Sequence, residues 1–207
     1  MAATQLPPPT TTAAKIIIKK VTNALQDIDV TAEILPDGTT ADKSVQGHTS
    51  FDPVGAWSDG QGGTVFFKTP GYSWEKKGAL EIVSKLSGPV QIKGNVKIQT
   101  IYGPNAKATD TSGYGRGTTP EDEAAGTTSL GFHESCHRDD YVNFLKLKPL
   151  PAFGGKPGQT KQQYAQAVTA FGNAIQKYFT DMDQDSFRKT DEVGYKSTEY
   201  DAKGPRP

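Results

Sequence analysis

The residues best suited to chemistry in this 207-residue chain form one pentapeptide, His133-Glu134-Ser135-Cys136-His137, which matches H-E-x-x-H. Side chains four residues apart lie one above the other on a helix, so the two imidazoles can bind one Zn²⁺ ion. Glu134 then lies beside the position of a metal-bound water, where a carboxylate can act as a general base. Two of the three histidines of the chain belong to this motif. The pentapeptide therefore predicts two zinc ligands and the catalytic base of a hydrolytic site.

The residues around the motif predict a helix over 129–148. Hydroxyl groups at Thr127-Thr128-Ser129 can cap its first turn, and Pro149 favours an end near Lys148. The apolar side of this helix is formed by Leu130, Phe132, Tyr141, Val142, Phe144 and Leu145. A simpler interpretation is a surface helix with two unrelated histidines and a salt-bridging glutamate, but it leaves the concentration of histidines unexplained.

A catalytic zinc ion usually has three protein ligands and a water, so one ligand must come from outside the motif. Glu192 is the preferred candidate because it continues the apolar row of a long C-terminal helix and its side chain is long. The other acidic candidates are Asp140, Asp181, Asp185, Asp191, Glu199 and Asp201. Asp140, one turn after His137, is expected to accept a hydrogen bond from an imidazole instead. Tyr195 is expected to stabilise the oxyanion of the reaction, with Tyr141 as the alternative.

Two further residues with reactive side chains are expected to lie away from the metal. The single cysteine, Cys136, comes one position before His137, so its side chain should point away from the ion and pack in the core. A single cysteine also excludes an internal disulfide. The third histidine, His48, lies in a Gly/Ser/Thr-rich segment and is expected in a solvated loop.

The C-terminal helix follows from the spacing of apolar residues. Thr160 is expected to cap it, and its apolar row alternates steps of three and four at Tyr164, Val168, Phe171, Ile175, Tyr178 and Met182. Continued in register, this row reaches Asp185, Lys189 and Glu192. Acidic side chains on an otherwise buried face need a partner, which favours a ligand role for one of them.

The first hundred residues predict a β-sheet. Strands are expected where β-branched residues or alternation of period two occur, at 15–21, 28–35, 64–68 and 90–102. Segment 79–86 fits a strand or a helix, and Gly94-Asn95 should interrupt the last strand as a bulge or a hairpin. Segment 38–62 is polar and glycine-rich, so it is expected to be a long loop.

Together these patterns predict one α+β domain over 15–207, after a flexible Pro/Thr-rich leader at 1–14. The domain should consist of an N-terminal antiparallel β-rich half at 15–102, a polar loop at 103–128 and a helical part at 129–201. Because the loop leads directly into the motif helix, it is expected to border the substrate cleft.

Composition limits the function classes. Basic and acidic residues number 23 each, so the net charge gives no argument for nucleic acid or an anionic membrane as partner. No segment has the roughly 18 apolar residues of a membrane span. The N-terminus lacks the basic and apolar regions of a secretory signal peptide. We therefore expect the protein to be cytoplasmic where it is synthesised, or exported by a route that needs no cleaved signal.

The motif helix, the strands before it and an acidic ligand on a later helix resemble the zincin metallopeptidases. The branch with a glutamate ligand, the gluzincins, is the most similar in outline. Thr190 to Tyr195 is also similar to the G-T-x-D-x-x-Y element of the aspzincins, with Glu192 at the position of their aspartate ligand. Lys189 replaces the glycine of that element, and the disulfides of that family are impossible here. The residues after His137 do not continue as the metzincin motif.

The resemblance covers residues 127–201. It implies that His133 and His137 bind Zn²⁺ and that Glu134 is the base of a zinc metalloendopeptidase. The chain is also similar to small bacterial zincins that contractile secretion systems carry as effectors, toxins or cargo, which implies a protein or peptide substrate and a secretion apparatus or cognate inhibitor as partner. Two other functions stay open: a zinc amidase that acts on cell-wall peptides, and a structural or cargo module whose motif is inert.

Overall fold

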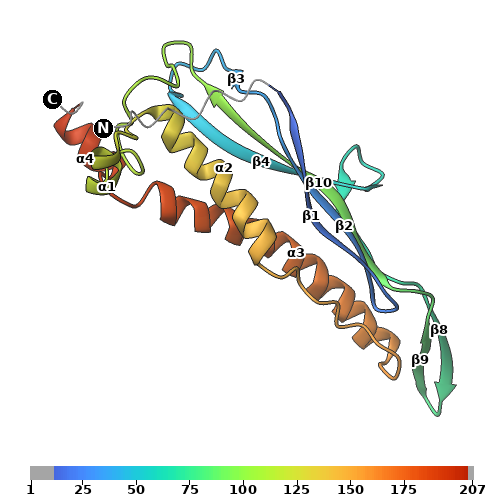
Figure 1. Cartoon of the computed structure of the whole chain (residues 1–207). Helices are drawn as coiled ribbons and strands as arrows, with labels where there is room; N and C mark the ends of the chain where they lie inside the picture. The colour runs from blue at the N-terminus through green and yellow to red at the C-terminus, as the bar shows by residue number, and fades with distance from the viewer. Residues whose placement is uncertain (1–11, 205–207) are drawn as a thin grey trace.

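A curled β-sheet lies against two long helices in the computed structural model, which describes residues 12–204 (Figure 1). The strands precede the helices in the chain, so the predicted α+β class is confirmed. Most of the predicted leader, residues 1–11, lies outside the described residues. Within the described part of the chain, no helix is both long enough and apolar enough to cross a membrane.

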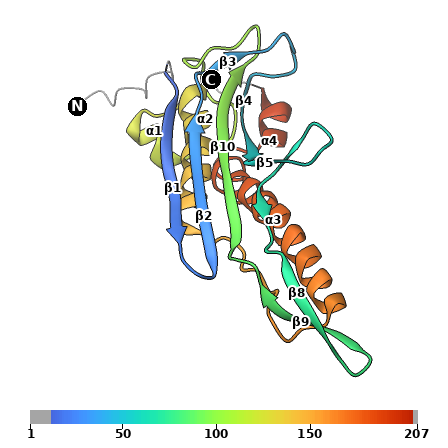
Figure 2. The same ribbon diagram turned by 90° about the vertical axis from the view of Figure 1, so that its right-hand side faces the viewer.

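The sheet is organised around its longest strand, β10 (Val90–Tyr102). Strand β2 (Gln26–Ile34) pairs with β10 in parallel, and β1 (Ala14–Thr22) pairs with β2 antiparallel (Figure 2). Strand β4 (Gly47–Gly55) pairs antiparallel with β10 along nine residues. Two short pairings complete the sheet, with β3 (Gly38–Thr39) parallel to β10 and β7 (Phe67–Lys68) antiparallel to it. The predicted antiparallel arrangement is therefore wrong in part, because the long connection between β2 and β10 returns the chain for parallel pairing.

The largest error in the expected strands is the segment 38–62. It contains the nine-residue strand β4 and the short strands β3 and β5 (Trp57–Ser58) rather than one loop. The reason is tertiary, since β4 pairs with β10 from Gly94 to Tyr102 and this ladder satisfies its backbone groups whatever its own propensity. Strand β4 becomes a wall of the candidate site.

Two smaller expectations are resolved by pairing. Segment 79–86 is a strand, β9 (Leu80–Leu86), which forms a projecting hairpin with β8 (Tyr72–Lys77) (Figure 2). Segment 64–68 is divided by Phe66 into β6 (Thr64–Val65) and β7. Gly94 forms neither a bulge nor a hairpin but continues the β10 ladder in register, and the ring of Phe66 packs where its side chain would be.

The two long helices begin as the sequence predicts. Helix α2 (Leu130–Leu147) has Ser129 as its N-cap, whose hydroxyl accepts a hydrogen bond from Phe132 N–H at 3.1 Å. Helix α3 (Lys161–Thr190) begins with a capping box between Thr160 and Gln163. Two short helices, α1 (Pro120–Ala125) and α4 (Ser197–Lys203), lie near one another at one end of the molecule (Figure 1).

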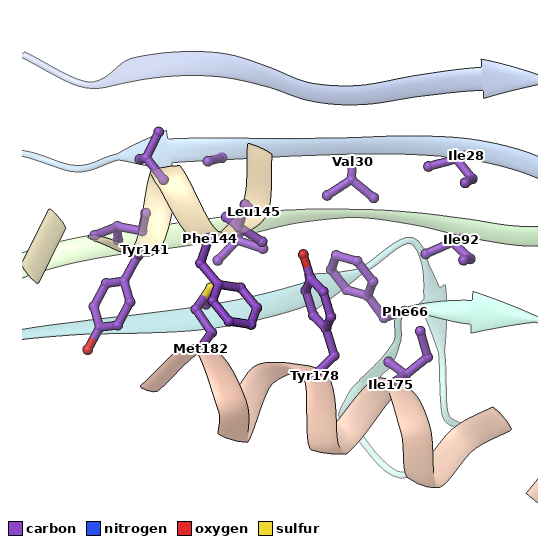
Figure 3. Packing of buried hydrophobic residues seen from close by; sticks show 14 of the residues in the cluster. Ile28, Val30, Phe66, Ile92, Tyr141, Phe144, Leu145, Ile175, Tyr178 and Met182 are labelled. Carbon is purple, nitrogen blue, oxygen red and sulfur yellow. The ribbon is translucent and has the colours of Figure 1, made fainter. Parts of the chain in front are cut away.

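The core lies between the sheet and the helices (Figure 3). Side chains of α2, α3 and the strands meet there, among them Tyr141, Phe144, Leu145, Ile175, Tyr178, Met182, Ile28, Val30 and Ile92. The buried row of α3 continues after Met182 through Ser186 and Thr190, both 0% exposed. The predicted continuation through Asp185, Lys189 and Glu192 is therefore wrong, because the last steps of the row are four residues long. At these two positions of the row, small hydroxyl side chains face α2.

Candidate metal centre

Two imidazoles and one carboxylate converge where α2 passes the C-terminal end of α3. The Nε2 atoms of His133 and His137 each lie 3.2 Å from Oδ1 of Asp191, and one ligand atom from each residue lies within 4.8 Å of the others. Ligand atoms of a tetrahedral zinc site lie about 3.3 Å apart, given zinc–ligand bonds of about 2.0–2.1 Å. The three side chains could therefore hold a divalent metal ion.

The acidic member of this group differs from the one preferred from the sequence. Glu192 is exposed and does not belong to the group, whereas Asp191, one of the alternatives, does. The N–H group of Asp191 still donates to the carbonyl of Phe187 at 2.9 Å, so the residue is the C-cap of α3 and keeps its helical direction. This direction brings its carboxylate to the imidazoles of α2. Glu192, one residue later, is past the contact between the helices.

The other acidic candidates have different surroundings. On α3, Asp181 is paired with Lys177 and Asp185 with Lys189, both four residues apart on the helix surface. Glu199 and Asp201 lie on α4 and are exposed. None of these belongs to the converging group among the described residues, and neither does Cys136. Burial raises the pKa of the Cys136 thiol to about 12, so it stays protonated and half-buried on α2.

Each imidazole has a hydrogen-bond partner that fixes its orientation. Nδ1 of His133 lies 3.1 Å from the carbonyl oxygen of Arg116. A carbonyl can only accept, so this Nδ1 is protonated and the lone pair of Nε2 points toward the space beside Asp191. Nδ1 of His137 lies 2.8 Å from the hydroxyl of Ser186. The two rings thus present the same nitrogen, Nε2, to one point.

Asp140 supports His137 indirectly. Its Oδ2 lies 3.5 Å from the Ser186 hydroxyl and accepts a hydrogen bond from the Thr190 hydroxyl at 2.9 Å. The expectation that Asp140 would accept an imidazole N–H directly is therefore corrected, because Ser186 occupies the intervening position. A hydroxyl that donates toward Asp140 can accept the Nδ1 proton of His137. Both hydroxyls belong to the buried row of α3.

A glycine turn brings the carbonyl of Arg116 to His133. Gly115 has a φ of +63°, and a Cβ there would clash with the carbonyl oxygen of Thr190 and approach the His133 ring. The N–H of Gly115 donates to the carbonyl of Tyr195 at 2.6 Å, and the N–H of Arg116 donates to that of Thr190 at 2.7 Å. The predicted loop thus borders the site and is bound to the end of α3.

The same turn is also fixed from its other side by Asp122 on α1. This carboxylate accepts hydrogen bonds from the Arg116 guanidinium, the shortest at 2.8 Å, and from the Gly117 N–H at 2.8 Å. Burial raises the pKa of Asp122, but these hydrogen bonds and the Arg116 charge outweigh it and lower the pKa to about 2. An ionised Asp122 therefore holds the turn at neutral pH.

The electrostatics of the cluster suit a cation. Burial raises the pKa of Asp191, but hydrogen bonds to His133 and His137 outweigh it and lower the pKa to about 2. Burial lowers the pKa of His133, whereas its hydrogen bond to Asp191 and the charge of Glu134 raise it, with a net increase. The group therefore favours a positive charge between these side chains, and a metal ion would compete with the proton for the same lone pairs.

Glu134 is buried in a cavity of about 270 Å³ that also contains the cluster. Its Oε2 accepts a hydrogen bond of 2.7 Å from the Thr49 hydroxyl on β4. A Cβ at Gly47 would lie only 2.6 Å from Oε1 of Glu134, so the absence of a side chain there leaves room for the carboxylate. His48, between Gly47 and Thr49, is exposed as expected. It lies on strand β4 rather than in a loop, and it lines the cavity.

The tyrosine that faces the cluster is Tyr114, not Tyr195. The Tyr114 ring lines the cavity, with its centroid 5.1 Å from that of His133. Burial, and then the charges of Asp191 and Glu134, raise the pKa of Tyr114 to about 12, so its hydroxyl remains a donor. Tyr195 is not among the residues that line the cavity, and its ring lies 5.1 Å from Nζ of Lys203. The sequence feature that could have identified Tyr114 is its position in the loop 103–128, which was expected to border the cleft.

The expected alternative to Tyr195, Tyr141, also lines the cavity. Its hydroxyl lies 3.2 Å from Oδ1 of Asp183, on α3, to which it donates. Burial raises the pKa of Tyr141 above its ordinary value, and the charge of Asp183 adds to this effect. The hydroxyl is therefore already directed toward a carboxylate of α3.

Comparisons with known proteins give no family for this chain. A scan against protein-family models finds no match, and searches of curated proteins and of solved structures find none either.

Proposed function

We propose that this protein is a zinc-dependent metalloendopeptidase with a zincin-like fold, in which His133, His137 and Asp191 bind the ion. One observation supports the proposal above all others: two Nε2 atoms and a carboxylate oxygen converge in the cavity that also contains Glu134. The order of the elements, a sheet followed by an H-E-x-x-H helix and a helix with an acidic ligand, agrees with a zincin outline. Delivery as a bacterial effector or cargo stays a prediction of the resemblance.

Beside the metal ligands, three residues of the cavity, Glu134, Thr49 and Tyr114, have a role in this proposal. A bound zinc ion would supply Lewis acidity for the scissile carbonyl and for a water molecule. Glu134 accepts the proton of the attacking water and passes it to the leaving amine. Thr49 donates to Oε2 of Glu134 and so fixes the direction of the carboxylate. The protonated hydroxyl of Tyr114 donates to the oxygen that becomes negative during attack.

The test combines metal analysis with hydrolysis. Protein purified without chelators is expected to contain one zinc ion per chain and to cleave casein. Glu134→Gln keeps a side chain of the same size that can still accept from Thr49, so zinc should remain bound while hydrolysis falls by about 10²–10⁴-fold. Full activity of Glu134→Gln would overturn the proposed role of this residue.

The same preparation separates the two alternatives. A zinc amidase that acts on cell-wall peptides would cleave purified peptidoglycan and leave casein intact. A structural or cargo module would contain no stoichiometric zinc and would cleave neither substrate. Either outcome would replace the endopeptidase proposal.

A further inference from the structure

A second cavity continues the metal-centre cavity along the space between β4 and α3. It has a volume of about 540 Å³ and shares His48, Thr49 and Asp183 with the cavity around Glu134. Its remaining lining residues are Ser50, Phe51, Pro53, Gln176, Phe179 and Thr180. The two cavities form one groove, hereafter the β4–α3 groove, with Asp183 at their junction.

Asp183 differs in charge balance from the two acidic residues beside it on α3. Asp181 is paired with Lys177, and Asp185 is paired with Lys189. Among residues 12–204, Asp183 has no ion pair, and its carboxylate accepts a hydrogen bond from the Tyr141 hydroxyl at 3.2 Å. No lysine or arginine occurs among the described residues that line either cavity. Asp183 therefore presents an unneutralised negative charge to the groove.

A bound divalent ion would not remove this charge. Asp191 belongs to the converging group, and with Glu134 it supplies two negative charges at the metal centre. A divalent cation would balance those two charges, and Asp183 would remain in excess. The groove beyond the metal centre is thus expected to attract a cation.

Part of the wall near Asp183 is apolar and aromatic. Phe51 of β4 and Phe179 of α3 have ring centroids 6.2 Å apart, and Pro53 lies further along the same strand. A lysine or arginine side chain matches this combination, because its methylene stem can lie on apolar surface while its charged end reaches a carboxylate. A glutamate side chain would be repelled by Asp183, and an uncharged one would leave Asp183 unpaired.

We propose that the β4–α3 groove binds a basic side chain of the peptide substrate and that Asp183 selects it, an inference that rests on the proposed peptidase function. The geometry assigns substrate preference to the groove and peptide-bond cleavage to the metal centre. Asp183 is in this view a specificity-determining residue.

The test uses quenched fluorescent peptides and the zinc-loaded full chain. One lysine is moved through successive positions of an alanine-rich peptide, and each peptide is compared with versions that carry norleucine or glutamate there. At one position, kcat/KM for the lysine peptide should exceed that for the norleucine peptide by about tenfold. This is the lower end of the range for a hydrogen bond to a charged group, because Asp183 is exposed to solvent. The preference should weaken as salt increases.

Substitutions then assign the preference to Asp183. Asp183→Asn should reduce the lysine-to-norleucine ratio to near one, and Asp183→Lys should favour glutamate. Asp181→Asn removes the same charge two residues away on α3 and serves as the matched control, so the ratio should stay as in the wild type. Equal ratios in wild type and Asp183→Asn would overturn the inference and leave the proposed function intact.

A binding measurement separates failure of this inference from failure of the proposed function. If no peptide is cleaved by the zinc-loaded chain, the peptidase proposal fails, and fluorescence polarisation of the labelled lysine peptide then tests the groove by itself. Binding about tenfold weaker in Asp183→Asn than in Asp181→Asn would support a basic ligand. Equal binding in the two variants would overturn it.

Discussion

Two cavities at opposite ends of the sheet differ in size and in chemistry. The larger, about 610 Å³, lies near the β8–β9 hairpin and the turn between β1 and β2, and Lys85 is the one charged residue among its described lining residues. The smaller, about 270 Å³, is lined by all three histidines together with Glu134, Asp183 and Asp191. Volume alone would select the cavity that lacks the candidate metal ligands.

The difference follows from the cost of buried charge. An apolar cavity needs no compensation, so its walls can be formed by side chains such as Leu86 and Phe153. Buried imidazoles and carboxylates must be paired and hydrogen-bonded, which requires several elements at fixed distances. The small cavity has this arrangement, since Arg116, Thr49 and Ser186 each support one of its polar side chains.

The largest expected effect comes from removing a ligand in the small cavity. His137→Ala should abolish stoichiometric zinc binding and reduce hydrolysis by on the order of 10³-fold or more, because two ligands bind the ion too weakly. Lys85→Ala changes a charged residue of the large cavity and should leave both zinc content and hydrolysis at the wild-type level. Metal analysis and a casein assay check this pair, and the reverse pattern would invert the assignment of the two cavities.

The second prediction compares two adjacent acids. Asp191→Asn should weaken zinc binding by at least about 10²-fold. Loss of a direct ligand should reduce the affinity more than loss of a group that only orients a ligand, which typically reduces it by about 10–100-fold. Glu192→Gln makes the same change at an exposed residue and should leave the affinity near that of the wild type. Competition with a chelator of known affinity measures both. A larger loss in Glu192→Gln would restore the ligand preferred from the sequence.

The third prediction compares two tyrosines. Tyr114→Phe should lower kcat by about 10²-fold, because a donor to the developing oxyanion is lost, while zinc content stays unchanged. Tyr195→Phe keeps the backbone contacts of Tyr195 with Gly115 and Thr118 and should change kcat little. Steady-state kinetics on one peptide are sufficient. A strong effect at Tyr195 alone would contradict the position of Tyr114 as donor.

The smallest effect concerns the stability of the turn that holds His133. The folded-state pKa of Asp122, about 2, lies below its ordinary value of 3.8. The stabilisation is therefore fully present above pH 3.8 and is lost as the pH falls toward 2. Asp122→Asn should cost about 1–2 kcal/mol at pH 7, after allowance for the partly exposed Arg116, and much less near pH 2.

Urea unfolding at several pH values measures this difference. Glu121→Gln, an exposed residue beside Asp122 on α1, is the matched control and should change the unfolding free energy little at any pH. If Asp122→Asn lowers the unfolding free energy by the same amount at every pH, the negative charge of Asp122 does not stabilise the turn.

Local signals were sufficient for the two long helices. The N-caps Ser129 and Thr160 and the apolar spacing predicted α2 and α3, because capping and periodicity act within one or two turns. The loop 103–128 was predicted to border the cleft, and Tyr114 and Arg116 lie there. Strand β4 was missed because its polar, glycine-rich sequence has little β-propensity, and only its ladder with β10 makes it a strand.

The sequence by itself determined that two imidazoles and a glutamate share one helix, since their spacing fixes their relative positions on α2. It did not determine the acid that meets them. A single step in chain position separates Asp191 from Glu192, and the choice depends on where α3 ends against α2 and on the step of four from Met182 to Ser186 and Thr190. Packing between distant segments decides such a choice, because it sets the rotation of one helix against another.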